Sequence, residues 1–446
     1  MVNNKITEYV QNHITDFFDY LTFQSISTQN KGIPETTKWL VQQFKELGAE
    51  VAETWHDQGA NPIVYASFKG NSDKTVLFYN HYDVQPPEPL SEWKSDPFIP
   101  TVREGKIFAR GICDDKGELI SRLTIIKYFM ENGGLPVNMK FFVEGSEEIG
   151  SPKVDEYVSA HQKELASDVC IWEGGSKDEN EDFQITCGLK GVIALDLEVK
   201  TATRDIHSSL ATYAPNAAWR LVQALNSMKS ISGKIEVAGF YDKVQELTPE
   251  TQAVVDGTSF NTRQAIQNAG ILTDKLVSNN HEYDLVNGTT MTINGLSSGY
   301  QGAGVKTIIP KSAAAKIDCR LVPDQDPDEI FELIRQHLGQ NGFTDIKITK
   351  TASVKPFRTN LTDPFIQLTK SVAEEVYQGK VALIPNMAGG GPAYPFYDVL
   401  NDPIVMIGIH YAGSGPHAPN ENIRVQDFID GSAYMAKLLT AYGTEK

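Results

Sequence analysis

The sequence predicts an α/β protein in which a mostly parallel sheet is covered by helices and an α+β two-layer domain is inserted into the chain. From about residue 35 to 190, short apolar runs alternate with helical stretches, which is the pattern of parallel strands joined by crossover helices. Several runs are continuously apolar, as expected for strands buried on both faces. These runs are residues 75–79, 139–143, 169–172 and, much later, 404–409.

The middle of the chain follows a different pattern. Residues 191–199 and 313–321 alternate apolar and polar side chains in the manner of half-exposed strands. Helical patterns lie at 216–228 and, after a Pro-Asp-Glu start, at 330–338. The order strand, helix, strand, strand, helix, strand predicts a two-layer sandwich. The expected domains are residues 1–191 with 358–446, and residues 192–357.

Composition limits the classes of function. The 446 residues, 41% of them hydrophobic, are enough for two ordinary domains. A formal charge of -17 argues against nucleic acid or an anionic membrane surface as the main ligand. No apolar run approaches the roughly 20 residues of a membrane span, and the N-terminal stretch has helical spacing instead of a signal sequence. We therefore expect a cytoplasmic protein, with reduced and buried thiols at Cys113, Cys170, Cys187 and Cys319.

His81 and Asp83 follow directly after the first continuous apolar run. On an extended segment, residues two apart project to the same face, so one side chain could bind a metal while the other steadies it. In open α/β sheets, ligands bind outside the carboxyl ends of the strands, which is where this pair is expected. A His-x-Asp pair alone is more often structural, and the interpretation depends on the motifs that accompany it.

Adjacent carboxylates lie in the turn at residues 110–117, which opens a helix. Asp115 and Glu118 resemble a capping box, in which the side chains close the first turn of a helix. Asp114 has no such local explanation. This difference makes Asp114 the candidate for a functional acid.

Further acidic and imidazole side chains follow other predicted strands. Glu147 and Glu148 come after residues 139–143, and Glu173 ends the run at 169–172, with Asp168 at the start of that run as the alternative acid. His417 follows the last apolar run. Imidazole and carboxylate together suit a borderline cation, with zinc as first choice and cobalt or manganese as alternatives. The surplus of acids favours two metal ions bridged by one carboxylate.

These motifs together resemble the two-zinc amidohydrolases and exopeptidases that include carboxypeptidase G, aminoacylase, acetylornithine deacetylase, succinyl-diaminopimelate desuccinylase and carnosine dipeptidases. HxD, GxxDxKG, EExGS, a later acid and a C-terminal His occur in this order over nearly the whole chain. The segments RGICDDKGE, DIHSS, KTIIP, CRLVPD and HAPNE look most like the cytosolic dipeptidase branch. The resemblance implies a zinc-peptidase sheet with a lid and dimerisation domain, which hydrolyses dipeptides or short peptides with a free C-terminal carboxylate.

The resemblance also implies the ligands of two divalent cations, zinc in the first place. One ion would be held by His81, Asp114 and Glu173. The second would be held by Asp114, Glu148 and His417, so that Asp114 is the bridge.

The remaining site residues are likewise implied by the resemblance. Glu147 would be the general base and acid, and Asp83 would orient His81. His207 would reach the active site of the other subunit of a homodimer and donate a hydrogen bond to the oxyanion. Arg320 would bind the substrate carboxylate. The loop beside it would contain Gly390 and Gly391, whose missing side chains allow close backbone approach.

Two departures from the dipeptidase pattern leave the substrate open. Glu173 stands where that branch usually has Asp, and Gly391 stands where it usually has Ser. The alternative is an N-acyl amino acid deacylase or desuccinylase, with the same metals and a different acyl pocket. A non-catalytic family member is disfavoured because Glu147 and all five ligands are present, and a two-metal nuclease or phosphatase is disfavoured by the net charge.

Overall fold

The computed structural model describes residues 2–444 except 57–58, 259–262, 264–265, 268 and 274–275. Within these ranges, none of the helices combines the length and the apolar composition that a membrane span requires. The chain divides into two compact units. The first unit comprises Met1–Cys187, Thr359–Pro385 and Pro395–Lys446, and the second comprises Gly188–Arg358 and Asn386–Tyr394.

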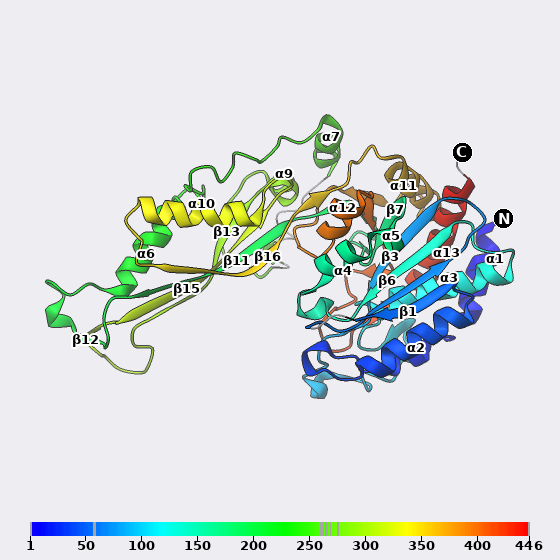
Figure 1. The fold of residues 1–446 in the computed structure, drawn as a ribbon, viewed down its shortest axis with the longest axis horizontal. Helices are drawn as coiled ribbons and strands as arrows, with labels where there is room; N and C mark the ends of the chain where they lie inside the picture. Colours follow the sequence, from blue (N-terminus) through cyan, green and yellow to red (C-terminus); the bar gives the residue numbers. More distant parts are fainter. Residues whose placement is uncertain are drawn as a thin grey trace. The chain divides into compact units, whose positions relative to one another are not determined.

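A mixed ten-stranded sheet forms the centre of the first unit (Figure 1). In spatial order the strands are β1 (Val51–Trp55), β2 (Ile63–Phe68), β6 (Asn138–Glu144), β3 (Thr75–His81), β7 (Val169–Trp172), β19 (Ile404–Met406), β9 (Phe183–Thr186), β8 (Ser176–Lys177) and β20 (His410–Tyr411), with β18 (Val381–Ile384) beside β9. The central strands β6, β3, β7 and β19 run parallel, and antiparallel strands flank them, which confirms the predicted mostly parallel sheet.

The central strands are buried because both faces of the sheet are covered. In β3, every residue from Val76 to His81 is buried, and Phe78 pairs in register with Phe141 and Ile171 of the neighbouring strands. Helices lie on both sides of the strands (Figure 1). The helices of this unit are α1 (Val2–His13), α2 (Ile33–Glu46), α3 (Lys116–Glu131), α4 (Val154–Ala160), α5 (Gln162–Leu165), α11 (Pro364–Val376), α12 (Tyr394–Leu400) and α13 (Val425–Thr444).

The predicted strand at 404–409 is shorter than expected. It ends at Met406, and the chain then bends at Ile409. A Cβ atom at Gly408 would lie 1.9 Å from Oε1 of Glu118, so the close approach of this carboxylate requires glycine here. A smaller sheet beside this region consists of β4 (Thr101–Arg103), β5 (Lys106–Phe108) and β21 (Asn422–Arg424).

The predicted capping box at the start of α3 is wrong. Asp115 precedes the helix, but its side chain makes no capping hydrogen bond. Its Oδ2 instead accepts the backbone N–H of His81 at 3.0 Å and Nδ2 of Asn80 at 2.6 Å. These donors are buried and need an acceptor, whereas the backbone N–H groups at the start of the helix can find other hydrogen-bond partners.

The main elements of the second unit are β11 (Gly191–Lys200), α6 (Ala217–Met228), α7 (Pro249–Gly257), α9 (His281–Asn287), β13 (Thr290–Ser298), β15 (Ser312–Leu321), α10 (Pro327–Gln340) and β16 (Lys347–Val354). They form a four-stranded antiparallel sheet in the order β13, β15, β11, β16, with helices α6 and α10 packed against it (Figure 1). Buried and less buried residues alternate along β11 and β15, as the half-exposed pattern predicted. Short pairs join β10 (Gly188–Leu189) to β17 (Phe357–Arg358) and β12 (Ile206–His207) to β14 (Ile308–Ile309).

Candidate metal centre

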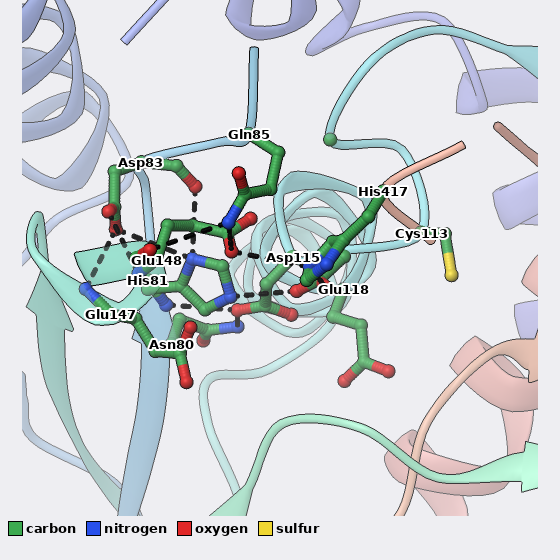
Figure 2. A network of polar contacts seen from close by, with 12 residues as sticks. Asn80, His81, Asp83, Gln85, Cys113, Asp115, Glu118, Glu147, Glu148 and His417 are labelled. Carbon is green, nitrogen blue, oxygen red and sulfur yellow. Dashed lines mark hydrogen bonds and ion pairs between the residues drawn. The ribbon is translucent and has the colours of Figure 1, made fainter. Parts of the chain in front are cut away.

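His81 ends β3, and its two ring nitrogens face different partners (Figure 2). Nδ1 lies 3.0 Å from the backbone carbonyl oxygen of Asp83 and 3.5 Å from its carboxylate. Nε2 lies 2.9 Å from Oδ1 of Asp114. Since a carbonyl oxygen can only accept, Nδ1 carries the hydrogen, and Nε2 of the neutral ring is free to be a metal ligand.

The carboxylate of Asp83 has a second set of contacts that the sequence did not reveal. Its Oδ1 accepts the backbone N–H of Glu147 at 3.2 Å, and its Oδ2 accepts the backbone N–H of Glu148 at 3.1 Å. Asp83 is fully buried. It therefore fixes the loop after β6 as well as the ring of His81.

His417 and Glu148 meet on the other side of Asp114. Nε2 of His417 lies 2.9 Å from Oδ2 of Asp114 and 3.2 Å from Oε2 of Glu148. Glu148 also accepts a hydrogen bond from Nε2 of Gln85 at 2.8 Å (Figure 2). Sequence reasoning missed Gln85, although it lies on the same extended segment as His81 and Asp83.

The structure brings five of the predicted residues into two groups. Ligand atoms of His81, Asp114 and Glu173 lie within 4.8 Å of one another, and so do those of Asp114, Glu148 and His417. Asp114 belongs to both. These are the two triplets that the resemblance implies, and their role as ligands stays a prediction.

Asp168, the alternative to Glu173, lies in neither group. Its Oδ2 accepts the backbone N–H of Thr75 at 2.7 Å, at the start of β3. Because β3 and β7 are parallel, this contact is at the amino end of the strands, opposite to Glu173. The structure therefore favours Glu173 over Asp168 as the functional acid.

The site concentrates carboxylates that are only partly accessible to water. Burial raises the pKa of Glu147 to about 7 and raises the pKa of Glu173 well above its usual value. The pKa of Asp114 is lowered, because hydrogen bonds from His417 and His81 outweigh the effect of burial. Close carboxylates repel one another, and a divalent cation would offset that repulsion.

The donor set fits such cations. Oε1 of Glu148 is buried and has no hydrogen-bond donor in the described part of the chain. A buried acceptor without a partner is costly, and a cation would satisfy it. Imidazole nitrogens combined with carboxylate oxygens suit zinc, cobalt or manganese.

Glu421 holds the loop that carries Asp114. Its carboxylate accepts the backbone N–H groups of Gly111 at 3.0 Å, Cys113 at 2.8 Å and Asp114 at 3.1 Å. It also accepts a hydrogen bond from Nη1 of Arg110 at 2.6 Å, and both members of this ion pair are buried. Sequence reasoning did not assign Glu421 a role, although it ends the HAPNE segment that begins with His417.

The other predicted site residues belong to the second unit. Nδ1 of His207 accepts the backbone N–H of Ser209 at 3.2 Å, which leaves the ring hydrogen on Nε2. Arg320 lies in β15, and a Cβ atom at Gly390 would be 3.7 Å from its Nη1. A Cβ atom at Gly391 would be 3.0 Å from Cδ1 of Leu189. Arg320 and Gly390 are therefore neighbours within this unit.

The parallel sheet and the two histidine–carboxylate groups beyond the ends of its strands define a metal-dependent hydrolase. The sequence profile of Peptidase family M20/M25/M40 matches residues 77–441. The chain therefore belongs to this family and is a metallopeptidase, as its motifs predicted.

Proteins of known activity resemble the chain over most of its length. It is 27% identical to the Cys-Gly metallodipeptidase dug1 of Schizosaccharomyces pombe over 433 residues, which cover 90% of this chain and 88% of that protein. It is 26% identical to the Beta-Ala-His dipeptidase of Homo sapiens over 472 residues, with coverage of 97% and 91%.

Solved structures show the same architecture. The M20 family metallo-carboxypeptidase Sso-CP2 from Sulfolobus solfataricus superposes with a TM-score of 0.89 at 34% identity, covering 97% of this chain and 99% of that one. Human carnosine dipeptidase 1 has the same fold, with a TM-score of 0.76 at 23% identity and coverage of 99% and 100%.

Proposed function

We propose that this metallopeptidase hydrolyses the amide bond of dipeptides or short peptides that carry a free C-terminal carboxylate. The observation that carries the proposal is the pair of ligand groups joined through Asp114, with the half-buried Glu147 beside them. The relatives named as Cys-Gly and Beta-Ala-His dipeptidases support dipeptides as the substrate class.

Two divalent cations complete the proposed site, with zinc as first choice and cobalt or manganese as alternatives. His81, Asp114 and Glu173 would hold one, and Asp114, Glu148 and His417 would hold the other. When bound, the cations polarise the substrate carbonyl and increase the acidity of the attacking water.

Glu147 transfers the proton in this proposal. Its carboxylate takes a proton from the attacking water and later gives one to the nitrogen of the leaving amine. Burial raises the pKa of Glu147 to about 7, which suits a group that must both accept and donate near neutral pH. Asp83 positions it through the hydrogen bond to its backbone N–H at 3.2 Å.

The second unit supplies the remaining groups. With Nδ1 accepting from Ser209, Nε2 of His207 carries the hydrogen that it would donate to the oxyanion, and we propose that it does so in the other subunit of a homodimer. Arg320 would bind the substrate carboxylate through two N–H groups. Gly390 beside it presents no side chain in the way of that carboxylate.

A second candidate is an N-acyl amino acid deacylase or desuccinylase. Glu173 favours it, because the resemblance gives Glu at this position in the deacylase branch and Asp in the dipeptidase branch. Gly391 departs from the dipeptidase pattern and leaves the substrate open. The residues that hold the cations and move the proton would be the same.

A substrate panel separates the two candidates. The purified protein is stripped with chelator, reloaded with zinc, cobalt or manganese, and offered dipeptides, N-acyl amino acids, and the same dipeptides with an amidated C-terminus. We expect turnover of free dipeptides and at least about tenfold less turnover of the amides. Turnover of N-acyl amino acids alone would establish the second candidate, and no dipeptide turnover with any metal would overturn the first.

A further inference from the structure

Arg122 and Glu118 form a buried ion pair on α3 that the proposed mechanism does not use. Nη2 of Arg122 lies 3.5 Å from Oε2 of Glu118, one helical turn away, and each residue is 2% exposed. The cavity beside them has a volume of about 10 Å³, which is room for no more than one water molecule. The two charges must therefore be satisfied by protein groups, and those groups lead to the metal centre.

Arg122 joins the ends of two central strands. Its Nη1 donates to the backbone carbonyl of Tyr79 at 2.5 Å and to the side-chain oxygen of Asn80. Its Nη2 donates to the backbone carbonyl of Trp172 at 3.1 Å. Asn80 directly precedes His81 and Trp172 directly precedes Glu173, so one guanidinium fixes the spacing between the strand ends that carry these two side chains.

Glu118 holds Glu173 from the other side. The backbone N–H of Gly174, the residue after Glu173, lies close enough to stabilise the ionised carboxylate of Glu118. It also accepts the backbone N–H of Ile409 at 3.4 Å, and its Oε1 lies 3.2 Å from Nε2 of His410. The backbone on both sides of Glu173 is thus tied to two residues one turn apart on the same helix.

The network also reaches Asp114, the third residue of the group that contains His81 and Glu173. Asn80, which accepts from Arg122, donates to Oδ2 of Asp115 at 2.6 Å, and the same oxygen accepts the backbone N–H of His81 at 3.0 Å (Figure 2). Asp115 directly follows Asp114. In the described part of the chain, the contacts of Arg122 and Glu118 include no immediate sequence neighbour of Glu148 or His417.

We infer that Arg122 and Glu118 are positioning residues for one of the two cations, the one proposed at His81, Asp114 and Glu173, and that they set its affinity separately from that of the other. The inference rests on the proposed two-metal site. Partners in the outer shell of a metal site typically change metal affinity by about 10- to 100-fold. An effect confined to one of two ions that share Asp114 distinguishes positioning from a general loss of stability.

The test replaces both charges at once with Glu118→Gln and Arg122→Met. Removing only one charge would leave the other buried and unpaired, which would destabilise the fold. Removing both charges avoids this destabilisation. Metal binding is measured by zinc titration against a chelating dye, alongside the melting temperature of the metal-free protein. We expect two ions bound by the unchanged protein, and in the double variant one ion of unchanged affinity and one bound at least about tenfold more weakly.

Further variants make the result decisive. Arg122→Lys keeps the positive charge beside Glu118, but a lysine side chain cannot reach both strand ends. This variant should weaken the binding of the same ion, and it provides the test if the double variant does not fold. In a Glu173→Ala background, which lacks the affected ion, the double change should not alter the affinity of the remaining ion. The matched control neutralises the pair Lys177–Asp427, whose charged atoms are 2.6 Å apart, with Lys177→Met and Asp427→Asn, and should leave both affinities unchanged.

The outcomes separate the inference from the proposed function. Fewer than two ions bound by the unchanged protein would overturn the two-metal site itself. The positioning role alone would be overturned if the unchanged protein binds two ions, but the double variant and Arg122→Lys bind both ions equally more weakly or bind both with unchanged affinity.

Discussion

Asp114 and His417 are 303 positions apart in the chain, yet Oδ2 of Asp114 lies 2.9 Å from Nε2 of His417. The other oxygen, Oδ1, lies 2.9 Å from Nε2 of His81. One carboxylate thus faces both imidazoles, one through each oxygen, which is the arrangement that a bridging ligand between two cations requires. Glu421 supports it, because its carboxylate accepts the backbone N–H of Asp114 and lies four residues beyond His417.

Replacing Asp114 by Asn should remove both cations, whereas His417→Ala should remove one. The amide has no charge and can offer only one oxygen, so it cannot bridge. Elemental analysis after dialysis measures the metal content. Asp168→Asn is the control, since that carboxylate contacts Thr75 at the opposite end of the strands, and it should retain two ions. One tightly held ion in Asp114→Asn would refute the bridge.

Glu147→Gln should keep both metal ions and lose about 10²- to 10⁴-fold in turnover, the range that a general base contributes. The amide preserves the shape of the side chain but cannot accept a proton from water. Turnover of a dipeptide and metal content are measured on the same preparation. Glu156→Gln, at an exposed carboxylate paired with Lys153, should behave as the unchanged protein, and full activity of Glu147→Gln would mean that another group is the base.

The fold could be predicted to a large extent because its signals are local. The continuous apolar runs at 75–79 and 169–172 became β3 and β7, since a strand covered by helices on both faces leaves no room for polar alternation. The run at 404–409 predicted too long a strand, because the approach of Glu118 to Gly408 is a tertiary contact without a sequence signal. The division into catalytic and dimerisation domains, with a homodimer, stays a prediction.

The site could be predicted only in part. His81, Asp114 and His417 belong to motifs with a recognisable order, so their grouping could be expected. The partners Gln85, Glu421 and Arg122 contact the site through backbone groups or single side chains far away in sequence, and no spacing rule marks them. Asp115 and Glu118 had a local explanation, the capping box. Both side chains are buried beside other donors that need an acceptor, so Asp115 accepts from the backbone N–H of His81 and Glu118 pairs with Arg122 instead.

His207→Ala should lose about 10²- to 10³-fold in turnover, the usual cost of removing one oxyanion donor. The protein should keep its metal ions and its oligomeric state, because the side chain is exposed and its contacts are to Ser209. Turnover is measured together with the molecular mass in solution. His56→Ala, an imidazole whose ring contacts Thr54, is the matched control. A monomeric protein, or unchanged turnover in the variant, would reject the role across subunits.

The stability of the metal-free protein should fall as the pH rises from about 5 to 7. Burial raises the pKa of Glu147 to about 7 and of Glu144 to about 8, so the folded chain keeps protons that the unfolded chain releases above its ordinary carboxyl pKa. Because the folded state then binds more protons, its free energy of unfolding decreases with rising pH across this window. Each unit of pKa shift is worth about 1.4 kcal/mol, so we expect a loss of at least about 2 kcal/mol.

Metal should reverse this dependence, because ligands must lose their protons to bind a cation. Urea unfolding at pH 5, 6 and 7, in chelator and in zinc, measures both slopes. Glu144→Gln should make the slope in chelator shallower, since the amide cannot titrate but can still accept the hydrogen bond from Ser151. If stability in chelator instead rose between pH 5 and 7, the buried carboxyls would already be ionised in the folded protein, and the centre would hold its negative charges without a cation.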